Sequence, residues 1–247
     1  MTEETRTQPK VRFAPRPPQE PRPTSEVVAR LVDGRTVAID EVRLLAARLK
    51  AALPGGEGFC VGMVSATAGE GKSSLCLGLA SVLAGEPGRK TLVVELDTRR
   101  PSLENALGLP RMAGLSEWLG NPGDSVPVQR VNPPGFALLP AGLEPLRRPE
   151  VLATARMTGL LAAARAEFEY VLIDCPPVLP VADAVLIQDG LDGFLFVVRS
   201  RHSPRETVMR AAARLKPEKV LGTVFNDQRD ILPNYYNYGD RYYGARA

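Results

Sequence analysis

Hydrophobic residues recur along the chain in two patterns that predict alternating strands and helices. Six short, almost entirely apolar runs are typical of buried strands: FCVGMVSA, TLVVEL, FALLPAG, YVLID, GFLFVV and VLGTVFN. Other segments repeat apolar residues every three or four positions and predict helices: IDEVRLLAARLKAAL, KSSLCLGLASVLAG, VLATARMTGLLAAARAEF and PRETVMRAAARLK. Together they predict an α/β fold with a mostly parallel twisted sheet flanked by helices, in which ligands bind at the carboxyl ends of the strands.

Both ends of the chain lack these periods. Residues 1–25 are rich in Pro and Arg without apolar spacing, which predicts a disordered arm. Residues 227–247 are polar and aromatic with almost no aliphatic side chains, which predicts a mobile C-terminal tail. The sequence therefore predicts one domain over residues 26–226, without internal repeats.

Composition narrows the classes of protein to which the chain can belong. A net charge of +3 argues against a protein built to coat nucleic acid, and no apolar run approaches the roughly 20 residues needed to cross a bilayer. The start of the chain does not resemble a signal peptide. Cys60, Cys76 and Cys175 are three cysteines without metal-ligand spacing, so we expect buried thiols in a reducing, cytoplasmic compartment. His202, the only histidine, lies in a polar segment and is expected on a surface loop.

The strongest motif is SATAGEGKSS at residues 65–74, which follows a predicted strand and opens a predicted helix. This context is typical of a phosphate-binding loop (P-loop), although Ala66 stands where the usual first glycine would be. Two glycines allow a tight path in which amides point at phosphate oxygens, a lysine reaches the β- and γ-phosphates, and a serine hydroxyl binds magnesium. The predicted nucleotide-binding residues are Ala68, Gly69, Glu70, Gly71, Lys72, Ser73 and Ser74.

Two further strands are predicted to deliver carboxylates to the same edge of the sheet. Asp174 ends the run YVLID before two prolines, and is expected to hold magnesium directly or through water. Glu95 and Asp97 end the run TLVVELD and, two residues apart, would face the same side of a regular strand. One acid would help to coordinate the metal while the other accepts a proton from an attacking hydroxyl. The alternatives are a strand-terminal acid used as a cap at Asp174, and a solvated strand end with surface ion pairs at Glu95 and Asp97.

These three segments together resemble the bacterial tyrosine kinases (BY-kinases) of capsule and exopolysaccharide systems, from about Asp40 to the end of the chain. In that family the phosphate loop is followed by D-x-D-x-R and D-x-P-P motifs, which here read ELDTRRP and DCPP. The LLPAG segment, Asp183 and GTVFND are smaller similarities, and Asn226 resembles the residue that reads adenine in related ATPases. The family also ends in a tyrosine cluster, which here comprises Tyr235, Tyr236, Tyr238, Tyr242 and Tyr243.

The resemblance implies a P-loop NTPase fold, the cofactors ATP and Mg²⁺, and autophosphorylation of the tail tyrosines, mostly between subunits. It assigns phosphate binding to Lys72, the metal to Ser73, Asp97 and Asp174, and the role of base to Glu95. Glu95 stands where the family usually has aspartate, so its carboxylate lies one methylene further from the backbone.

Partners are also implied by the resemblance alone. They are a membrane-anchored polysaccharide co-polymerase that activates the kinase at the inner face of the cell membrane, further copies of this chain in a ring, and a cognate tyrosine phosphatase. No nucleic acid is expected. The family's ring-forming E-x-x-R-x-x-R helix here reads Asp40-x-x-Arg43-x-x-Ala46, without the final arginine.

Two other functions fit parts of the sequence. A partitioning or division-site ATPase shares the fold, but usually carries an extra lysine where Thr67 stands, and its membrane-binding versions end in an amphipathic helix. An ATP-binding scaffold with little catalysis would explain Glu95 as a mark of lost kinase activity. Phosphorylation of the tail separates a kinase from a scaffold, and ATP hydrolysis stimulated by DNA or lipid would favour the partitioning ATPase.

Overall fold

An eight-stranded sheet forms the centre of the molecule in the computed structural model, which describes residues 11–24, 26–33, 37–53, 58–121 and 125–227. The strand order is β1-β4-β5-β3-β6-β2-β7-β8. All neighbouring strands are parallel except β4 and β5. The strands are β1 (Arg12–Pro15), β2 (Phe59–Ser65), β3 (Thr91–Glu95), β4 (Ser125–Val131), β5 (Phe136–Leu139), β6 (Tyr170–Asp174), β7 (Gly193–Arg199) and β8 (Val220–Asn226).

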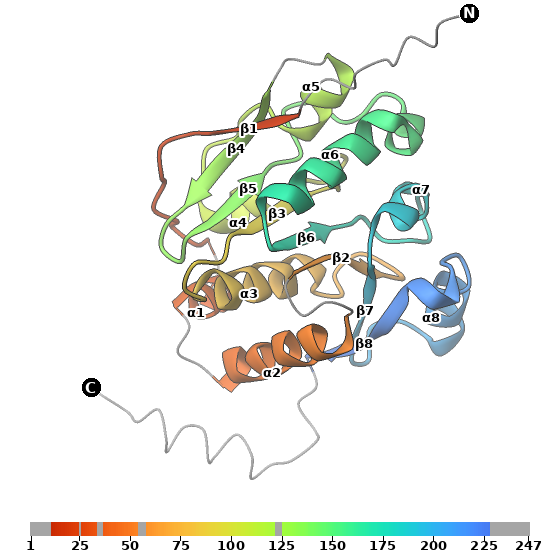
Figure 1. Ribbon diagram of the computed structural model, residues 1–247. Helices are drawn as coiled ribbons and strands as arrows, with labels where there is room; N and C mark the ends of the chain where they lie inside the picture. The colour runs from red at the N-terminus through yellow and green to blue at the C-terminus, as the bar shows by residue number, and fades with distance from the viewer. Residues whose placement is uncertain (1–10, 25, 34–36, 54–57, 122–124, 228–247) are drawn as a thin grey trace, which may run out of the picture.

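Helices cover both faces of this sheet, as Figure 1 shows. Residues of α1 to α4 belong to the apolar core on one face, and residues of α5 to α8 belong to the core on the other. The helices are α1 (Glu26–Asp33), α2 (Val37–Ala52), α3 (Lys72–Ala84), α4 (Leu103–Leu107), α5 (Leu115–Gly120), α6 (Ala155–Glu167), α7 (Asp183–Ile187) and α8 (Arg205–Ala212), with 3₁₀ turns at Pro149–Ala153, Gln188–Gly190 and Pro217–Lys219.

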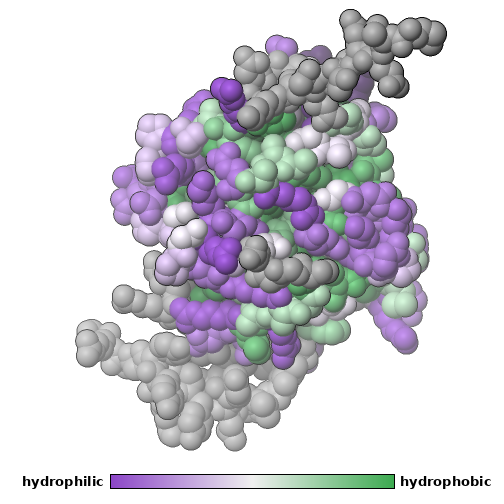
Figure 2. Space-filling view, in the orientation of Figure 1, coloured by the Kyte–Doolittle hydropathy of each residue, from purple (hydrophilic) through white to green (hydrophobic). Residues whose placement is uncertain are grey.

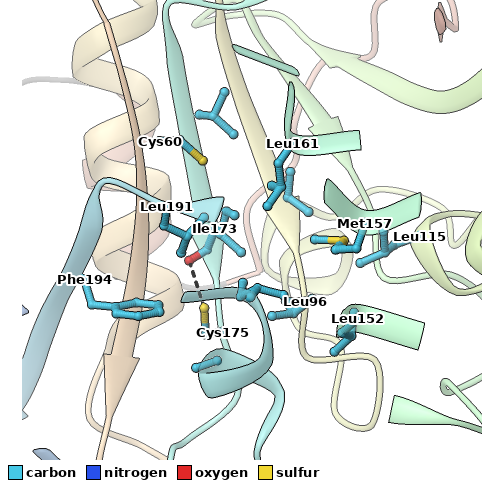
Figure 3. Packing of buried hydrophobic residues seen from close by; sticks show 14 of the residues in the cluster. Cys60, Leu96, Leu115, Leu152, Met157, Leu161, Ile173, Cys175, Leu191 and Phe194 are labelled. Atoms are coloured by element: carbon cyan, nitrogen blue, oxygen red, sulfur yellow. Dashed lines mark hydrogen bonds between the residues drawn. The ribbon is translucent and has the colours of Figure 1, made fainter. Parts of the chain in front are cut away.

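The central strands are apolar on both sides because each side faces a layer of helices. In β6, Leu172 lies in the core under α3, while Val171 and Ile173 lie in the core under α6. Figure 3 shows this second core, in which the Cys175 thiol lies 3.7 Å from the Ile173 carbonyl oxygen and is placed to donate to it. Burial raises the pKa of the Cys60 thiol to about 12. All three cysteines are free and buried, as predicted.

The predicted α/β fold and its six strands are confirmed, and each predicted helix is present. The structure adds elements that the pattern did not indicate: β1, β4, α1, α4, α5 and α7. The predicted disordered arm is wrong over residues 11–24, because β1 extends the sheet beyond β4 and Phe13 packs edge-on against Phe168 with ring centroids 5.3 Å apart. Prolines are tolerated at such an edge, where one side of the strand needs no ladder hydrogen bonds. Residues 1–10 and the predicted tail, residues 228–247, lie outside the described residues.

The helix with the incomplete E-x-x-R-x-x-R pattern is α2. Asp40 and Arg43 form an ion pair of 2.6 Å on its surface, and Ala46 is buried in the core. In the described part of the chain, no helix is long and apolar enough to cross a membrane. Figure 2 accordingly shows hydrophilic residues spread over the visible face, interrupted by smaller hydrophobic areas.

Candidate active site

The phosphate loop lies at the carboxyl end of β2, between its last residue and the first turn of α3. Gly69 and Gly71 have φ angles of 80° and 95°, in the left-handed region that favours glycine. A Cβ at Gly71 would lie 1.9 Å from Asn226 Nδ2, so only glycine fits there. The predicted motif therefore forms a tight loop at the N-terminus of a 13-residue helix, where phosphate is bound favourably.

The two reactive side chains at the start of α3 are held by neighbours within the site. Lys72 is buried and donates to Ser65 Oγ at 3.0 Å. Ser73 donates to Asp174 Oδ2 at 2.6 Å, which joins α3 to the carboxyl end of β6. Ser74 is half-buried in the same turn, whereas Ala68 is exposed at the top of the loop. The structure thus brings the predicted lysine, serine and aspartate together.

Asp174 has an unused oxygen in a buried position. It is 2% exposed, and its Oδ1 has no hydrogen-bond partner in the described structure. Burial raises its pKa to about 7, although the Ser73 hydroxyl and the Lys72 charge act in the opposite direction. An unpaired buried carboxylate oxygen is costly unless a cation or donor joins it, so the residue suits a magnesium ion.

This donor set is small, as it is in many magnesium sites that take most of their ligands from phosphates and water. No group of three or more His, Cys, Asp or Glu side chains within the described residues is arranged to hold a metal. Ser73 and Asp174 would hold the ion together with the nucleotide, which fits the preference of Mg²⁺ for one or two carboxylates plus substrate phosphates.

Glu95 and Asp97 have different environments, contrary to the expectation that they share one face of a strand. Glu95 is fully buried and accepts from the backbone N–H groups of Ser102 and of Leu103, the latter at 2.8 Å, while the Ala141 N–H lies 3.5 Å from its second oxygen. Its longer side chain thus anchors the start of α4 and the loop after β5. Burial raises the pKa of Glu95, and these N–H groups act to lower it. This geometry does not fit the predicted role of Glu95 as base.

Asp97 lies two residues beyond the end of β3, whose last residue Glu95 pairs with Asp174 across the sheet, and it is half-buried. Its Oδ1 accepts from the Arg100 N–H at 3.0 Å. Among the described residues no hydrogen-bond donor lies on Oδ2. Asp97 is therefore the more accessible of the two carboxylates.

The end of β8 and the segment after β7 close the other side of the phosphate loop. Asn226 donates to the Glu70 carbonyl at 2.9 Å, which places it beside the loop as predicted for a nucleotide-binding residue. His202 is exposed on a surface loop, also as predicted, but its Nε2 lies 2.9 Å from the Ala68 carbonyl oxygen. No motif in the sequence indicates this contact.

Sequence reasoning also missed contacts that surround the acidic motif. The Ser102 hydroxyl lies 3.2 Å from Ser73 Oγ, at the edge of the candidate metal site. Arg99 forms an ion pair of 2.5 Å with buried Asp183, whose other oxygen has no partner in the described structure. For Arg99 the signal was its place as the fifth residue of ELDTRRP, and its partner is evident only once α7 is in place.

Glu104, near this site in α4, makes stability depend on pH. It is 2% exposed, and burial raises its pKa to about 7 despite a hydrogen bond of 3.0 Å from the Met112 N–H. A raised carboxyl pKa contributes stability that is full below about pH 4.5 and is lost as the pH rises through about 7. We expect Glu104→Gln, which keeps the acceptor but cannot ionise, to gain stability relative to the wild type between pH 5 and pH 8. Urea unfolding at the two pH values measures this change.

Glu117→Gln is the matched control. Burial acts to raise the pKa of Glu117, but the N–H groups of Gly114 and Glu144 outweigh it and the net pKa is lowered. Its contribution is present above about pH 4.5 and is lost only in more acidic solution, so the difference from the wild type should be the same at pH 5 and pH 8. Equal pH responses of the two variants would contradict the assignment at Glu104.

Comparison with known proteins identifies relatives of this fold and site. The sequence is 30% identical over 196 residues to the tyrosine-protein kinase CpsD of Streptococcus agalactiae, covering 78% of this chain and 84% of that protein. It is 33% identical over 180 residues to the succinoglycan biosynthesis transport protein ExoP of Rhizobium meliloti, covering 70% of this chain and 23% of that protein.

Solved structures agree with these relatives. The kinase domain of the Escherichia coli tyrosine kinase ETK is similar with a TM-score of 0.73 and 26% identity, covering 83% of each chain. No family model matches the sequence. Given the identity to CpsD over most of both chains, the fold shared with ETK and the phosphate loop beside two acidic strand ends, this chain belongs to the bacterial tyrosine-protein kinases.

Proposed function

We propose that this chain transfers the γ-phosphoryl group of ATP·Mg²⁺ to tyrosine hydroxyls of its own C-terminal cluster, mostly on a neighbouring copy. The observation that carries the proposal is the unpartnered Oδ1 of buried Asp174, beside Ser73 at the phosphate loop. The names of relatives such as CpsD support the same activity. The acceptors would be Tyr235, Tyr236, Tyr238, Tyr242 and Tyr243.

Each residue of the site has a part in this mechanism. Amides of the loop from Ala68 to Ser74 bind the phosphates, and Lys72 moves from Ser65 to the β- and γ-phosphates. Ser73 and Asp174 hold magnesium, which supplies charge neutralisation on the phosphates when bound. Asn226 reads the adenine from the end of β8.

Asp97 takes the tyrosine proton in this mechanism, in place of the metal role that the resemblance implied for it, and Glu95 holds the loops around it. We assign the proton to Asp97 rather than to Glu95 because Asp97 is half-buried with no donor on its Oδ2 among the described residues, while the oxygens of buried Glu95 face backbone N–H groups. A positioned carboxylate of this kind contributes about 10²- to 10⁴-fold to a rate.

The cellular role follows from the relatives. ExoP is named for succinoglycan biosynthesis and transport, and we infer that this chain regulates the synthesis or export of an exopolysaccharide or capsule. Its activator would be a membrane-anchored co-polymerase that recruits it to the inner face of the cell membrane. A cognate tyrosine phosphatase would reverse the modification, and copies of the chain would assemble into a ring.

Charge gives the modification a physical effect. Residues 228–247 span roughly 70 Å when extended, enough to enter a neighbouring site. Each phosphate adds about −1.5 to −2 charge at neutral pH, so five add on the order of −8 to −10. Repulsion from the acidic site of Asp97 and Asp174 would then release the tail and loosen the assembly.

Mass-spectrometric mapping of phosphotyrosine on the protein from its native cells, during polysaccharide synthesis, tests the proposal. We expect phosphate on the tail tyrosines of the wild type and none in a Lys72→Ala strain. A variant with all five tail tyrosines replaced by Phe is the control, and should retain ATP binding while losing the signal. An unmodified tail in the wild type would exclude autophosphorylation and leave an ATP-binding scaffold as the function.

A further inference from the structure

The phosphate loop contains a fully buried carboxylate, that of Glu70, although the loop itself lies at the surface. Its neighbours Ala68 and Gly69 are exposed. The Glu70 carboxylate accepts from Thr67 Oγ1 at 3.0 Å, from the hydroxyl of Ser203, and from the Arg199 N–H at 2.6 Å. Every one of these donors belongs to the protein, so the carboxylate is occupied without a ligand.

The donors come from two segments that are far apart in sequence. Thr67 belongs to the loop, while Arg199 ends β7 and Ser203 lies in the segment that leads to α8. Thr67 Oγ1 and Ser203 Oγ are themselves 2.9 Å apart, so the two hydroxyls and the carboxylate form one cluster, in which each hydroxyl donates its single hydrogen either to the carboxylate or to the other hydroxyl. Buried networks whose members are all satisfied hold their segments in one arrangement.

Other contacts between the same segments are exposed and therefore weaker. His202 Nε2 lies 2.9 Å from the Ala68 carbonyl oxygen, and Arg199 Nη1 donates to the Gly69 carbonyl at 3.4 Å. Solvent competes with such contacts. The buried Glu70 carboxylate is thus the main fastening of the loop to the segment from Arg199 to Ser203.

The loop needs contacts that restrain it, because its glycines make its backbone flexible. Gly69 and Gly71 flank Glu70 and both have positive φ, so the backbone on each side has the conformational freedom of glycine. A flexible loop must be ordered when phosphates bind, and a loop that is already ordered binds them more tightly. Glu70 lies between the two flexible points.

We propose that Glu70 is a positioning residue for the triphosphate of ATP, which preorganises the phosphate loop by fastening it to the segment from Arg199 to Ser203. The inference rests on the proposed function, in that this loop binds ATP. It predicts a change in ATP affinity opposite to the change that charge repulsion alone would cause. A carboxylate near phosphates repels them, so its charge alone would make its removal tighten ATP binding. Preorganisation makes its removal weaken ATP binding.

The test measures the dissociation constant of ATP·Mg²⁺ for the full chain by titration calorimetry. Glu70→Ala should raise this dissociation constant about tenfold or more. A tenfold rise corresponds to a loss of about 1.4 kcal/mol of binding free energy at 25 °C. Glu70→Gln should stay within about threefold of the wild type, because its carbonyl accepts the Arg199 N–H while its amide donates to the hydroxyls of Thr67 and Ser203. The Michaelis constant for ATP should rise in Glu70→Ala and stay near the wild-type value in Glu70→Gln, with little change in kcat at saturating ATP in either variant.

Further variants keep the test decisive if Glu70→Ala folds poorly. Ser203→Ala removes one donor and leaves the carboxylate, so it should weaken binding in the same direction by a smaller factor. Asp189→Ala, at an exposed pair with Lys216, is the control and should leave affinity unchanged. Affinity that is unchanged or tighter in Glu70→Ala, or equally weak in Glu70→Gln, overturns the inference alone. A wild type that binds no ATP overturns the proposed function as well.

Discussion

Replacing Asp174 by Asn should lower the rate of tyrosine phosphorylation by about a thousandfold while leaving the fold intact. The substitution is isosteric, and the Asn carbonyl can still accept from the Ser73 hydroxyl as Oδ2 does at 2.6 Å. The amide group, however, takes the place of the unpartnered Oδ1 and presents hydrogens where a cation would bind. Loss of a metal that provides several kcal/mol of charge stabilisation corresponds to a factor of this size.

Stability should change in the opposite direction to activity. Burial raises the pKa of Asp174 to about 7, so its contribution to stability is full below about pH 3.8 and is lost as the pH rises through about 7. In magnesium-free buffer at pH 8 the wild type carries a buried carboxylate that the Lys72 charge offsets only in part, and Asn removes that carboxylate. We therefore expect Asp174→Asn to unfold at the same or a higher urea concentration than the wild type at pH 8.

Nucleotide binding with and without magnesium distinguishes this role from a structural one. In the wild type Mg²⁺ should strengthen ATP binding, and in Asp174→Asn this strengthening should be lost while metal-free ATP binds as before. Phosphorylation rates and calorimetric titrations of the full chain measure both quantities. If Asp174→Asn kept a normal response to Mg²⁺, the carboxylate would not be a metal ligand.

The residues of this site that sequence could predict are those with local signals. The phosphate loop needs its glycines, Lys72 and Ser73 within a few residues, and an apolar strand on one side of it with a helix on the other. Asp174 ends a buried strand, and parallel strands deliver their ends to one edge. Such features are determined by neighbours in sequence, and the structure brings all of them together.

The features that sequence could not predict depend on distant segments. Glu95 is buried because amides from the start of α4 and from Ala141, 46 positions later, meet its carboxylate. Strand β1 forms because β4 offers it an edge, and no apolar period marks either segment. Helices α4, α5 and α7 have five or six residues, too few for a period of 3.6 to be visible.

The proposed roles of Asp97 as the base and of Glu95 as a residue that holds the loops predict different effects when each is replaced by its amide. Asp97→Asn should lower the maximal rate of autophosphorylation by about 10²- to 10⁴-fold, because the amide cannot accept the tyrosine proton. ATP affinity should stay within about threefold, since Ser73, Lys72 and Asp174 are unchanged. The amide oxygen can still accept from the Arg100 N–H, so the loop keeps its shape.

Glu95→Gln is the matched variant, because it makes the same change of carboxylate to amide two residues away. Its carbonyl oxygen can accept from the N–H groups of Ser102 and Leu103, and only the weak contact to Ala141 is lost. We expect its rate to stay within about tenfold of the wild type. Single-turnover rates at saturating ATP, measured on both variants over a range of pH, decide the matter. A large loss in Glu95→Gln with a small one in Asp97→Asn would reverse the assignment and make the buried glutamate the base.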